Sequence, residues 1–184
     1  KARFQNVRFL ARDPADPASA IERAITHEAL AGLDGETGAV QGSYQGMIPP
    51  FPEVSRWIKE PREDWAEARG GPQLLVLWSI DQNKLVRIDQ WLTYLEEGYR
   101  DVGLKVVSVV STHDDKRMED YLREHPLPGS VGVDVLPENS VGIGESFESY
   151  FIRRFNLPRV LLLDLDGTVL WEGDPGFEIN EEPV

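Results

Sequence analysis

Two short apolar runs on either side of one helical pattern most constrain the fold of this chain. Residues 74–79 are almost entirely apolar, and residues 104–112 are rich in valine. Short runs of this kind are typical of strands that are buried on both faces of a sheet. Between the runs, apolar residues recur three and four positions apart up to Gly103, at Leu85, Ile88, Leu92, Leu95, Tyr99 and Val102. The pattern predicts a strand, an amphipathic helix and a second strand parallel to the first.

Further elements extend this unit toward the C-terminus. Asp114 is expected to begin a helix that Pro126 and Pro128 end, with an inner face made of Met118, Tyr121, Leu122 and His125. Residues 131–136 are expected to form a short strand. Residues 159–163 and 168–171 are expected to form two strands joined by a hairpin turn at residues 164–167. This order predicts an α/β fold with a mixed sheet, parallel where helices cross over and antiparallel at the final hairpin.

The N-terminal third has a different character. Asp16 and Pro17 are typical of a helix start, and the apolar pattern predicts a helix over residues 17–33. Glycines and prolines from Gly35 to Pro52 indicate a linker, followed by a short segment at residues 54–59 and a turn of helix around Trp65. We therefore divide the chain into an arm, helix and linker at 1–52, a main domain at 53–176, and an acidic tail at 177–184.

Charge and composition limit the classes of function. The 184 residues carry a net charge of -13, which argues against nucleic acid as a partner. No run approaches the roughly 20 apolar residues that span a bilayer. The first twelve residues hold only basic charges, at Lys1, Arg3, Arg8 and Arg12, so this arm is either a membrane-surface contact or a solvated terminus. A start at Lys1 and not at Met is expected when a signal peptide or an anchor has been removed.

Cofactor and metal motifs are not expected. The chain has no cysteine, and its three histidines, His27, His113 and His125, show no metal-ligand spacing. His113, Asp114 and Asp115 follow a strand end, where ligands commonly bind, but helix capping by Asp114 explains them with fewer assumptions. Aromatic residues with helical spacing occur at Phe147, Tyr150, Phe151 and Phe155. Packing in the core explains this stripe better than a cofactor site does.

The main domain resembles the thioredoxin-like proteins of the periplasmic cytochrome-maturation and alkyl-hydroperoxide-reductase type. The resemblance rests on the strands at 75–78 and 103–108, on Leu157-Pro158, and on the segments 160–167 and 171–173. Counted back from Gly103, the Cys-Pro-Pro-Cys motif of that family falls on Gln82, Asn83, Lys84 and Leu85. Both thiols are thus replaced at a degenerate active site. The family also ends in a long helix, whereas only eleven residues follow Gly173, so this C-terminus is expected to be shortened.

The resemblance further implies a cis peptide bond before Pro158 and a location outside the cytoplasm. Because disulfide exchange needs thiolates, the chain is expected to lack redox activity and not to be an enzyme. The leading interpretation is a protein-binding accessory or structural subunit, in a complex associated with a membrane. One alternative is a peptide-binding module that uses the groove at Leu157-Pro158.

A second alternative comes from Asp164-Leu-Asp166-Gly167-Thr168, which matches the nucleophile motif of haloacid-dehalogenase-type phosphohydrolases. In those enzymes the first Asp is phosphorylated and the second is the acid/base. Their remaining catalytic residues come from the long chain after the motif, and only 16 residues follow Thr168 here. The same residues also suit a hairpin turn, which requires only side-chain hydrogen-bond acceptors and a glycine at this position.

Overall fold

The computed structural model describes residues 43–60, 64, 71–80, 88–137, 144–150 and 157–173. The predicted arm, the helix at 17–33, the turn at Trp65 and the acidic tail lie outside the described residues. None of the helices in the described part of the chain is long and apolar enough to span a bilayer.

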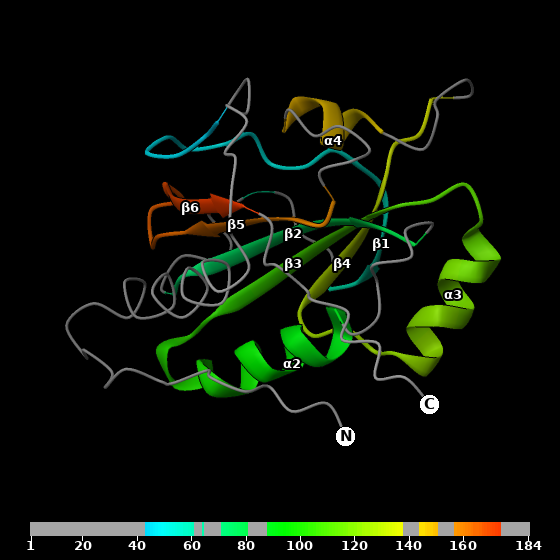
Figure 1. Ribbon diagram of the computed structural model, residues 1–184, viewed down its shortest axis with the longest axis horizontal. Helices are drawn as coiled ribbons and strands as arrows, with labels where there is room; N and C mark the ends of the chain where they lie inside the picture. Colours follow the sequence, from blue (N-terminus) through cyan, green and yellow to red (C-terminus); the bar gives the residue numbers. More distant parts are fainter. Residues whose placement is uncertain are drawn as a thin grey trace, which may run out of the picture.

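The described strands form one six-stranded sheet in the order β1-β4-β3-β2-β5-β6 (Figure 1). Two parallel pairs lie at its centre, β2 with β3 and β3 with β4. The pairs of β2 with β5, β5 with β6 and β1 with β4 are antiparallel. The predicted mixed sheet with an antiparallel final hairpin is therefore confirmed. The strands are β1 (Val54–Lys59), β2 (Gln73–Ser79), β3 (Lys105–Ser111), β4 (Ser130–Asp134), β5 (Arg159–Leu163) and β6 (Val169–Gly173).

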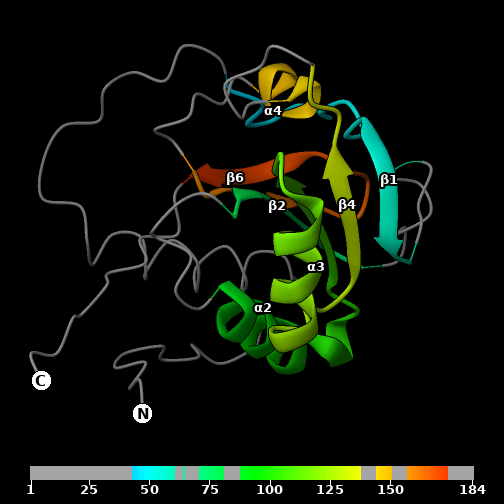
Figure 2. The same ribbon diagram turned by 90° about the vertical axis from the view of Figure 1, so that its right-hand side faces the viewer.

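Helices lie on both faces of this sheet. Figure 2 shows α2 (Ile88–Gly98) and α3 (Asp115–Glu124) on one side and α4 (Glu145–Ser149) on the other. The central strands alternate between two cores, as the period-two geometry of a strand requires. Leu74, Val76 and Trp78 of β2 face the helices α2 and α3, whereas Leu75 and Leu77 face Phe147 and Tyr150 of the α4 segment.

The long helix predicted up to Gly103 is wrong at its C-terminal end. The α-helix ends at Gly98, and a 3-10 turn, η2 (Arg100–Val102), follows it. Glycine weakens a helix because it loses more backbone entropy than other residues, and a tighter last turn is common at helix ends. Gly103 still closes the segment, with a φ of 78° that favours glycine.

Three other segments agree with the prediction only in part. The strand predicted over 131–136 is β4 at Ser130–Asp134. The segment at 54–59 is β1, an edge strand that is only partly buried. Its pairing with β4 has two register shifts, and apolar and polar residues do not alternate regularly along it. The aromatic stripe begins with Phe147 in the five-residue α4 and continues with Tyr150, which directly follows that helix. Both side chains are buried as predicted, and Phe151 and Phe155 lie outside the described residues.

Part of the predicted linker lies against the domain. We call residues 43–50 the strap. The backbone N–H of Gly46 donates to the carbonyl of Val169 at 2.8 Å, and the N–H of Val169 donates to the carbonyl of Met47 at 2.9 Å. The strap therefore covers part of the outer edge of β6, which would otherwise leave backbone groups unpaired. The Tyr44 hydroxyl donates to the Ser149 carbonyl at 3.0 Å, so the strap also contacts α4.

Candidate functional site

The four positions assigned to the degenerate active site, Gln82 to Leu85, lie outside the described residues. They connect the carboxyl end of β2, at Ser79, to the amino end of α2, at Ile88. In α/β sheets, ligands commonly bind beyond the carboxyl ends of strands. The residues that flank this connection therefore define the candidate site.

Trp78 lies at the carboxyl end of β2 and is fully buried. Its indole Nε1–H donates to the Ser108 Oγ on β3 at 2.7 Å, so the one polar atom of the ring has a partner. On its other side, the Trp78 ring contacts the Tyr121 ring of α3, with centroids 5.6 Å apart. Trp78 thus joins the sheet to α3 beside the candidate site.

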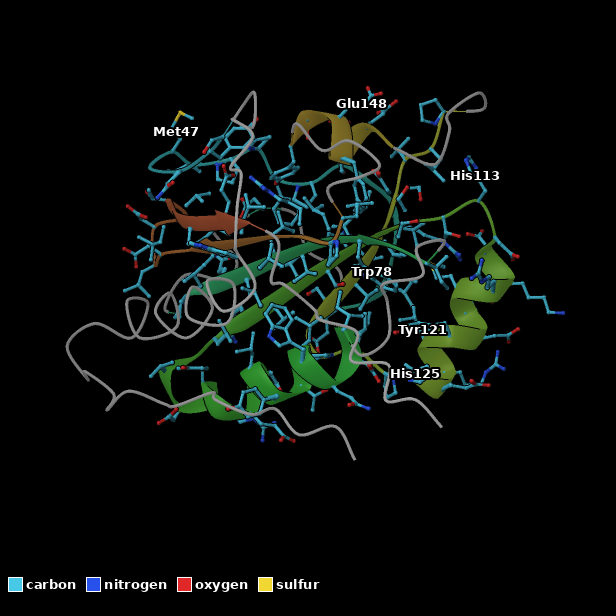
Figure 3. All side chains as sticks on the ribbon, in the orientation of Figure 1. Met47, Trp78, His113, Tyr121, His125 and Glu148 are labelled. Atoms are coloured by element: carbon cyan, nitrogen blue, oxygen red, sulfur yellow. The ribbon has the colours of Figure 1, made fainter. Side chains whose placement is uncertain are left out.

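A column of side chains continues from Trp78 toward solvent (Figure 3). The Tyr121 ring stacks on the His125 ring at a centroid distance of 4.7 Å. The His125 Nδ1 lies 3.0 Å from the Asp89 Oδ2, so the end of α3 is joined to the first turn of α2. Asp89 is the more buried of the pair, with 15% of its side chain exposed against 45% for His125.

This column can orient an imidazole and keep a phenol neutral. A hydrogen bond from Nδ1–H to a carboxylate fixes the tautomer and leaves Nε2 as the acceptor. Burial, and to a lesser extent the charge of Asp89, raises the pKa of Tyr121 to about 12. In the part of the chain that the structure describes, no group of three or more His, Cys, Asp or Glu side chains could hold a metal ion.

Sequence reasoning missed one member of this column. It placed Tyr121 and His125 on the inner face of a helix, but it did not single out Asp89. The two partners are 36 residues apart on different helices, so no local spacing relates them. Only the angle between α2 and α3 brings them together.

Leu157 and Pro158 come immediately before β5, and the Leu157 side chain lies on the other face of the sheet. Their peptide bond is cis, as the resemblance implies. Both residues are buried, and the Leu157 side chain belongs to the core that includes Phe147 and Tyr150. These contacts explain the apolar residue at position 157 by packing.

Asp164 and Asp166 lie in the turn between β5 and β6, which are antiparallel. The Asp164 Oδ1 accepts from the Leu165 N–H at 2.7 Å, and the Asp166 Oδ1 accepts from the Thr168 N–H at 2.9 Å. Gly167 has a φ of 89°, so it supplies the left-handed conformation that the turn requires. These hydrogen bonds support the turn interpretation of the Asp-Leu-Asp-Gly sequence.

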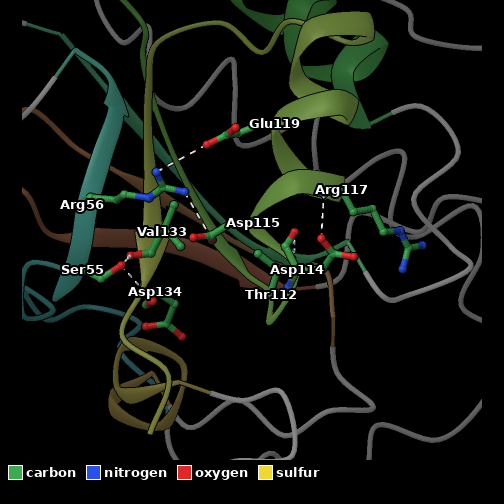
Figure 4. A network of polar contacts seen from close by, with 9 residues as sticks. All are labelled: Ser55, Arg56, Thr112, Asp114, Asp115, Arg117, Glu119, Val133 and Asp134. Atoms are coloured by element: carbon green, nitrogen blue, oxygen red, sulfur yellow. Dashed lines mark hydrogen bonds and ion pairs between the residues drawn. The ribbon is translucent and has the colours of Figure 1, made fainter. Parts of the chain in front are cut away.

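Asp114 caps α3 as predicted, because its Oδ1 accepts from the Arg117 N–H at 2.9 Å (Figure 4). His113 is exposed. Asp115 instead pairs with Arg56 of β1, whose guanidinium also lies 3.5 Å from the Glu119 carboxylate. These contacts join the edge strand β1 to α3.

Asp134, at the end of β4, is a polar core residue that sequence reasoning did not single out. It is 2% exposed, and its Oδ1 accepts from the N–H groups of Val135 at 2.9 Å and Ser146 at 3.0 Å. Its Oδ2 has no hydrogen-bond partner among the described residues. Burial raises the pKa of Asp134 to about 6, although the hydrogen bonds from Ser146 and Val135 act in the opposite direction.

No protein-family model matches the chain. No curated protein matches its sequence either. The comparison with solved structures, in contrast, finds 135 matching chains.

A protein described as a thioredoxin-like superfamily protein aligns with a TM-score of 0.58 at 16% identity, over 73% of this chain and 88% of its own. A thiol-disulfide isomerase from Corynebacterium glutamicum aligns with a TM-score of 0.55 at 16% identity, over 69% and 86%. A protein described as the thiol:disulfide interchange protein DsbE from Chlorobium tepidum aligns with a TM-score of 0.51 at 20% identity, over 62% and 74%.

The TM-scores above 0.5 show a shared fold, and identities of 16–20% leave activity open. The mixed sheet and the helices on its two faces agree with the alignments. Two of these three proteins are named for thiol-disulfide chemistry, which needs cysteine. This chain has the thioredoxin-like fold, and its sequence contains no cysteine.

Proposed function

We propose that this protein is a redox-inactive thioredoxin-like domain that binds other proteins as an accessory or structural subunit and is not an enzyme. The observation that carries the proposal is a thioredoxin-like fold with no cysteine in 184 residues. Thiol–disulfide exchange needs one thiolate to attack a sulfur and a second thiol to resolve the mixed disulfide. An amide at position 82 and an alkyl group at position 85 can do neither.

We extend the proposal to a complex outside the cytoplasm and beside a membrane. Its support is the resemblance of residues 54–176 to periplasmic proteins. The charge of -13 also suits a soluble subunit that recognises basic surfaces of a partner.

The two alternatives have weaker support. A peptide-binding module would need a peptide to reach the backbone at Leu157. Only 1% of the Leu157 residue surface is exposed. A phosphohydrolase would need Asp164 and Asp166 free for chemistry, and both carboxylates accept backbone hydrogen bonds within a turn. We therefore favour the accessory role over both.

The proposal is tested on the full chain in its source cells. A tagged copy is released from membranes with a mild detergent and analysed by size-exclusion chromatography with mass identification. A defined complex of constant composition, much larger than 20.8 kDa, is expected. Elution of all the protein near 20.8 kDa would overturn the accessory role.

A second experiment tests the loss of redox chemistry. The double variant Gln82→Cys and Leu85→Cys is compared with the natural chain in an insulin-reduction assay. The natural chain is expected to show no activity, and the variant to gain activity if the two positions match the cysteine sites. The variant Gln82→Ser and Leu85→Ser is the matched control. Activity in the natural chain would contradict redox inactivity.

A further inference from the structure

Three of the four large apolar side chains exposed among the described residues lie on two adjoining segments. Met47 is 52% exposed and Ile48 is 60% exposed, both in the strap, and Leu165 in the β5–β6 turn is 47% exposed. The fourth, Ile58, is 41% exposed and belongs to β1 at the opposite edge of the sheet. We call Met47, Ile48 and Leu165 the apolar corner.

Backbone hydrogen bonds hold the two segments together. The N–H and the carbonyl of Val169 bond to the carbonyl of Met47 and to the N–H of Gly46. Val169 directly follows the turn, which the Asp164 N–H closes by donating to the Thr168 carbonyl at 2.8 Å. Figure 3 shows the Met47 side chain at the outer edge of the strap, pointing away from the sheet.

The strap has a defined conformation in this position. Gly46 adopts a φ of 78°, and the Met47 N–H donates to the Tyr44 carbonyl at 2.8 Å, which forms a tight turn. Pro49 and Pro50 follow Ile48 and restrict the backbone further. The exposed apolar side chains therefore lie on a preorganised surface, which lowers the entropy cost of binding.

Within the strap and the β5–β6 turn, the two described segments that form the apolar corner, the charged side chains are acidic. Residues 43–50 contain no charged side chain, and residues 164–168 contain Asp164 and Asp166 with no Lys or Arg. Hydrogen bonds from Thr168 lower the pKa of Asp166, which keeps this carboxylate ionised. The nearest basic residue of the hairpin, Arg159, is 3.2 Å from the Glu172 carboxylate, and both side chains are largely buried.

We propose that the apolar corner and the two turn carboxylates form a docking surface for a basic amphipathic segment of a partner protein. Apolar side chains of the segment cover Met47, Ile48 and Leu165, and its Lys or Arg side chains face Asp164 and Asp166. The negative charge disfavours an anionic lipid surface as the occupant. This inference rests on the proposed protein-binding function and specifies where the partner binds.

The probe is a 14-residue peptide of leucine and lysine with helical amphipathic spacing, titrated into the full ¹⁵N-labelled chain. Amide shift changes are expected in residues 43–50 and 164–169. Binding is expected to weaken at least about tenfold in the variant Ile48→Ser and Leu165→Ser, and between 50 and 500 mM NaCl. Changes centred elsewhere, or no binding, would overturn the proposal.

The matched control is Ile58→Ser, which removes the fourth exposed apolar side chain and is expected to leave the affinity unchanged. A leucine and glutamate peptide of the same pattern is expected not to bind. Vesicles of phosphatidylcholine and phosphatidylglycerol are the remaining arm. Binding of the vesicles in place of the basic peptide would assign the surface to lipid and overturn the proposal.

Isolating the native complex from cells that express each variant tests this inference separately from the proposed function. If the complex survives in the Ile48→Ser and Leu165→Ser variant, the docking surface is wrong while the accessory role stands. If no complex exists in the natural chain, the accessory role itself fails. Loss of the complex in this variant but not in Ile58→Ser supports both.

Discussion

Among single residues, Asp134 shows how one buried carboxylate can organise a junction between elements. Its Oδ1 joins the end of β4 to the start of α4 through Val135 and Ser146, while the Ser146 hydroxyl donates to the Glu53 carbonyl. Its other oxygen is buried without a partner among the described residues. The hydrogen bonds that Oδ1 accepts stabilise the fold, whereas the buried negative charge of the ionised carboxylate destabilises it.

Asp134→Asn is expected to stabilise the protein at neutral pH. The folded-state pKa of about 6 lies above the unfolded value near 3.9, so ionisation destabilises the fold increasingly as pH rises between these values. The asparagine keeps an oxygen acceptor and removes the charge. The gain in unfolding free energy should be about 2 kcal/mol larger at pH 7.5 than at pH 4.5.

Urea unfolding of both proteins at the two pH values measures this difference. Asp134→Ala is the control, because it removes both the charge and the acceptor. A gain for Asp134→Asn that does not change between pH 4.5 and 7.5 would contradict the account.

Single residues also show what the sequence could predict about the candidate site. Asp114 was predicted as a helix cap because the cap and its partner Arg117 are three residues apart, so the signal is local. The pair of Asp89 and His125 and the pair of Asp134 and Ser146 depend on how separate elements meet. No spacing in the sequence encodes such contacts.

Among the elements, α3 depends on its cap. Asp114→Ala is expected to lower the unfolding free energy by about 1 kcal/mol, because the Arg117 N–H loses its acceptor. Asp115→Ala removes only an exposed ion pair with Arg56, and it should cost less than about 0.5 kcal/mol. Thermal unfolding of the two variants measures both values. Equal losses in the two variants would refute a specific capping role.

The contact between α2 and α3 can be measured through Asp89 and His125. A double-mutant cycle with Asp89→Asn and His125→Gln is expected to give a coupling of about 0.5–1 kcal/mol at pH 6, because both side chains are partly shielded from water. Urea unfolding of the four proteins gives this coupling. A value of zero would mean that the 3.0 Å contact does not stabilise the helix pair.

The elements differ in how far their sequences revealed them. The strands β2 and β3 were predicted because every residue in 74–79 and 106–111 is buried and is either apolar or small. The edge strand β1 has three polar residues, bulges against β4 and buries only some side chains, so it gives no clear alternation. The end of α2 was misplaced because the apolar spacing continues through Tyr99 and Val102, although the backbone tightens after Gly98.

In the whole molecule, the pair of Arg159 and Glu172 joins three parts of the chain. The two side chains, 13% and 8% exposed, connect β5 to β6, and the Glu172 carboxylate also accepts from the Tyr44 N–H of the strap at 3.3 Å. Glu172→Gln leaves the Arg159 charge without its partner. The expected cost is about 3 kcal/mol of unfolding free energy, together with faster proteolysis within residues 43–50.

Chemical unfolding and limited proteolysis with mass identification of the fragments measure the two effects. The control is Glu97→Gln, a change of the same type at an exposed position of α2. Unchanged stability and unchanged cleavage in Glu172→Gln would show that the pair does not hold the strap.

The strap also has a consequence for how the protein is made. Tyr44 bonds to Glu172 across 128 positions, and the Tyr150 hydroxyl donates to the Pro50 carbonyl across 100 positions. A ribosome delivers the chain from the N-terminus, so the strap emerges long before β6 exists. Contacts between such distant positions form late and slowly. The core that contains Phe147, Tyr150 and Val169 therefore cannot close until β6 has been synthesised, and until then the Tyr44 side chain is available to chaperones.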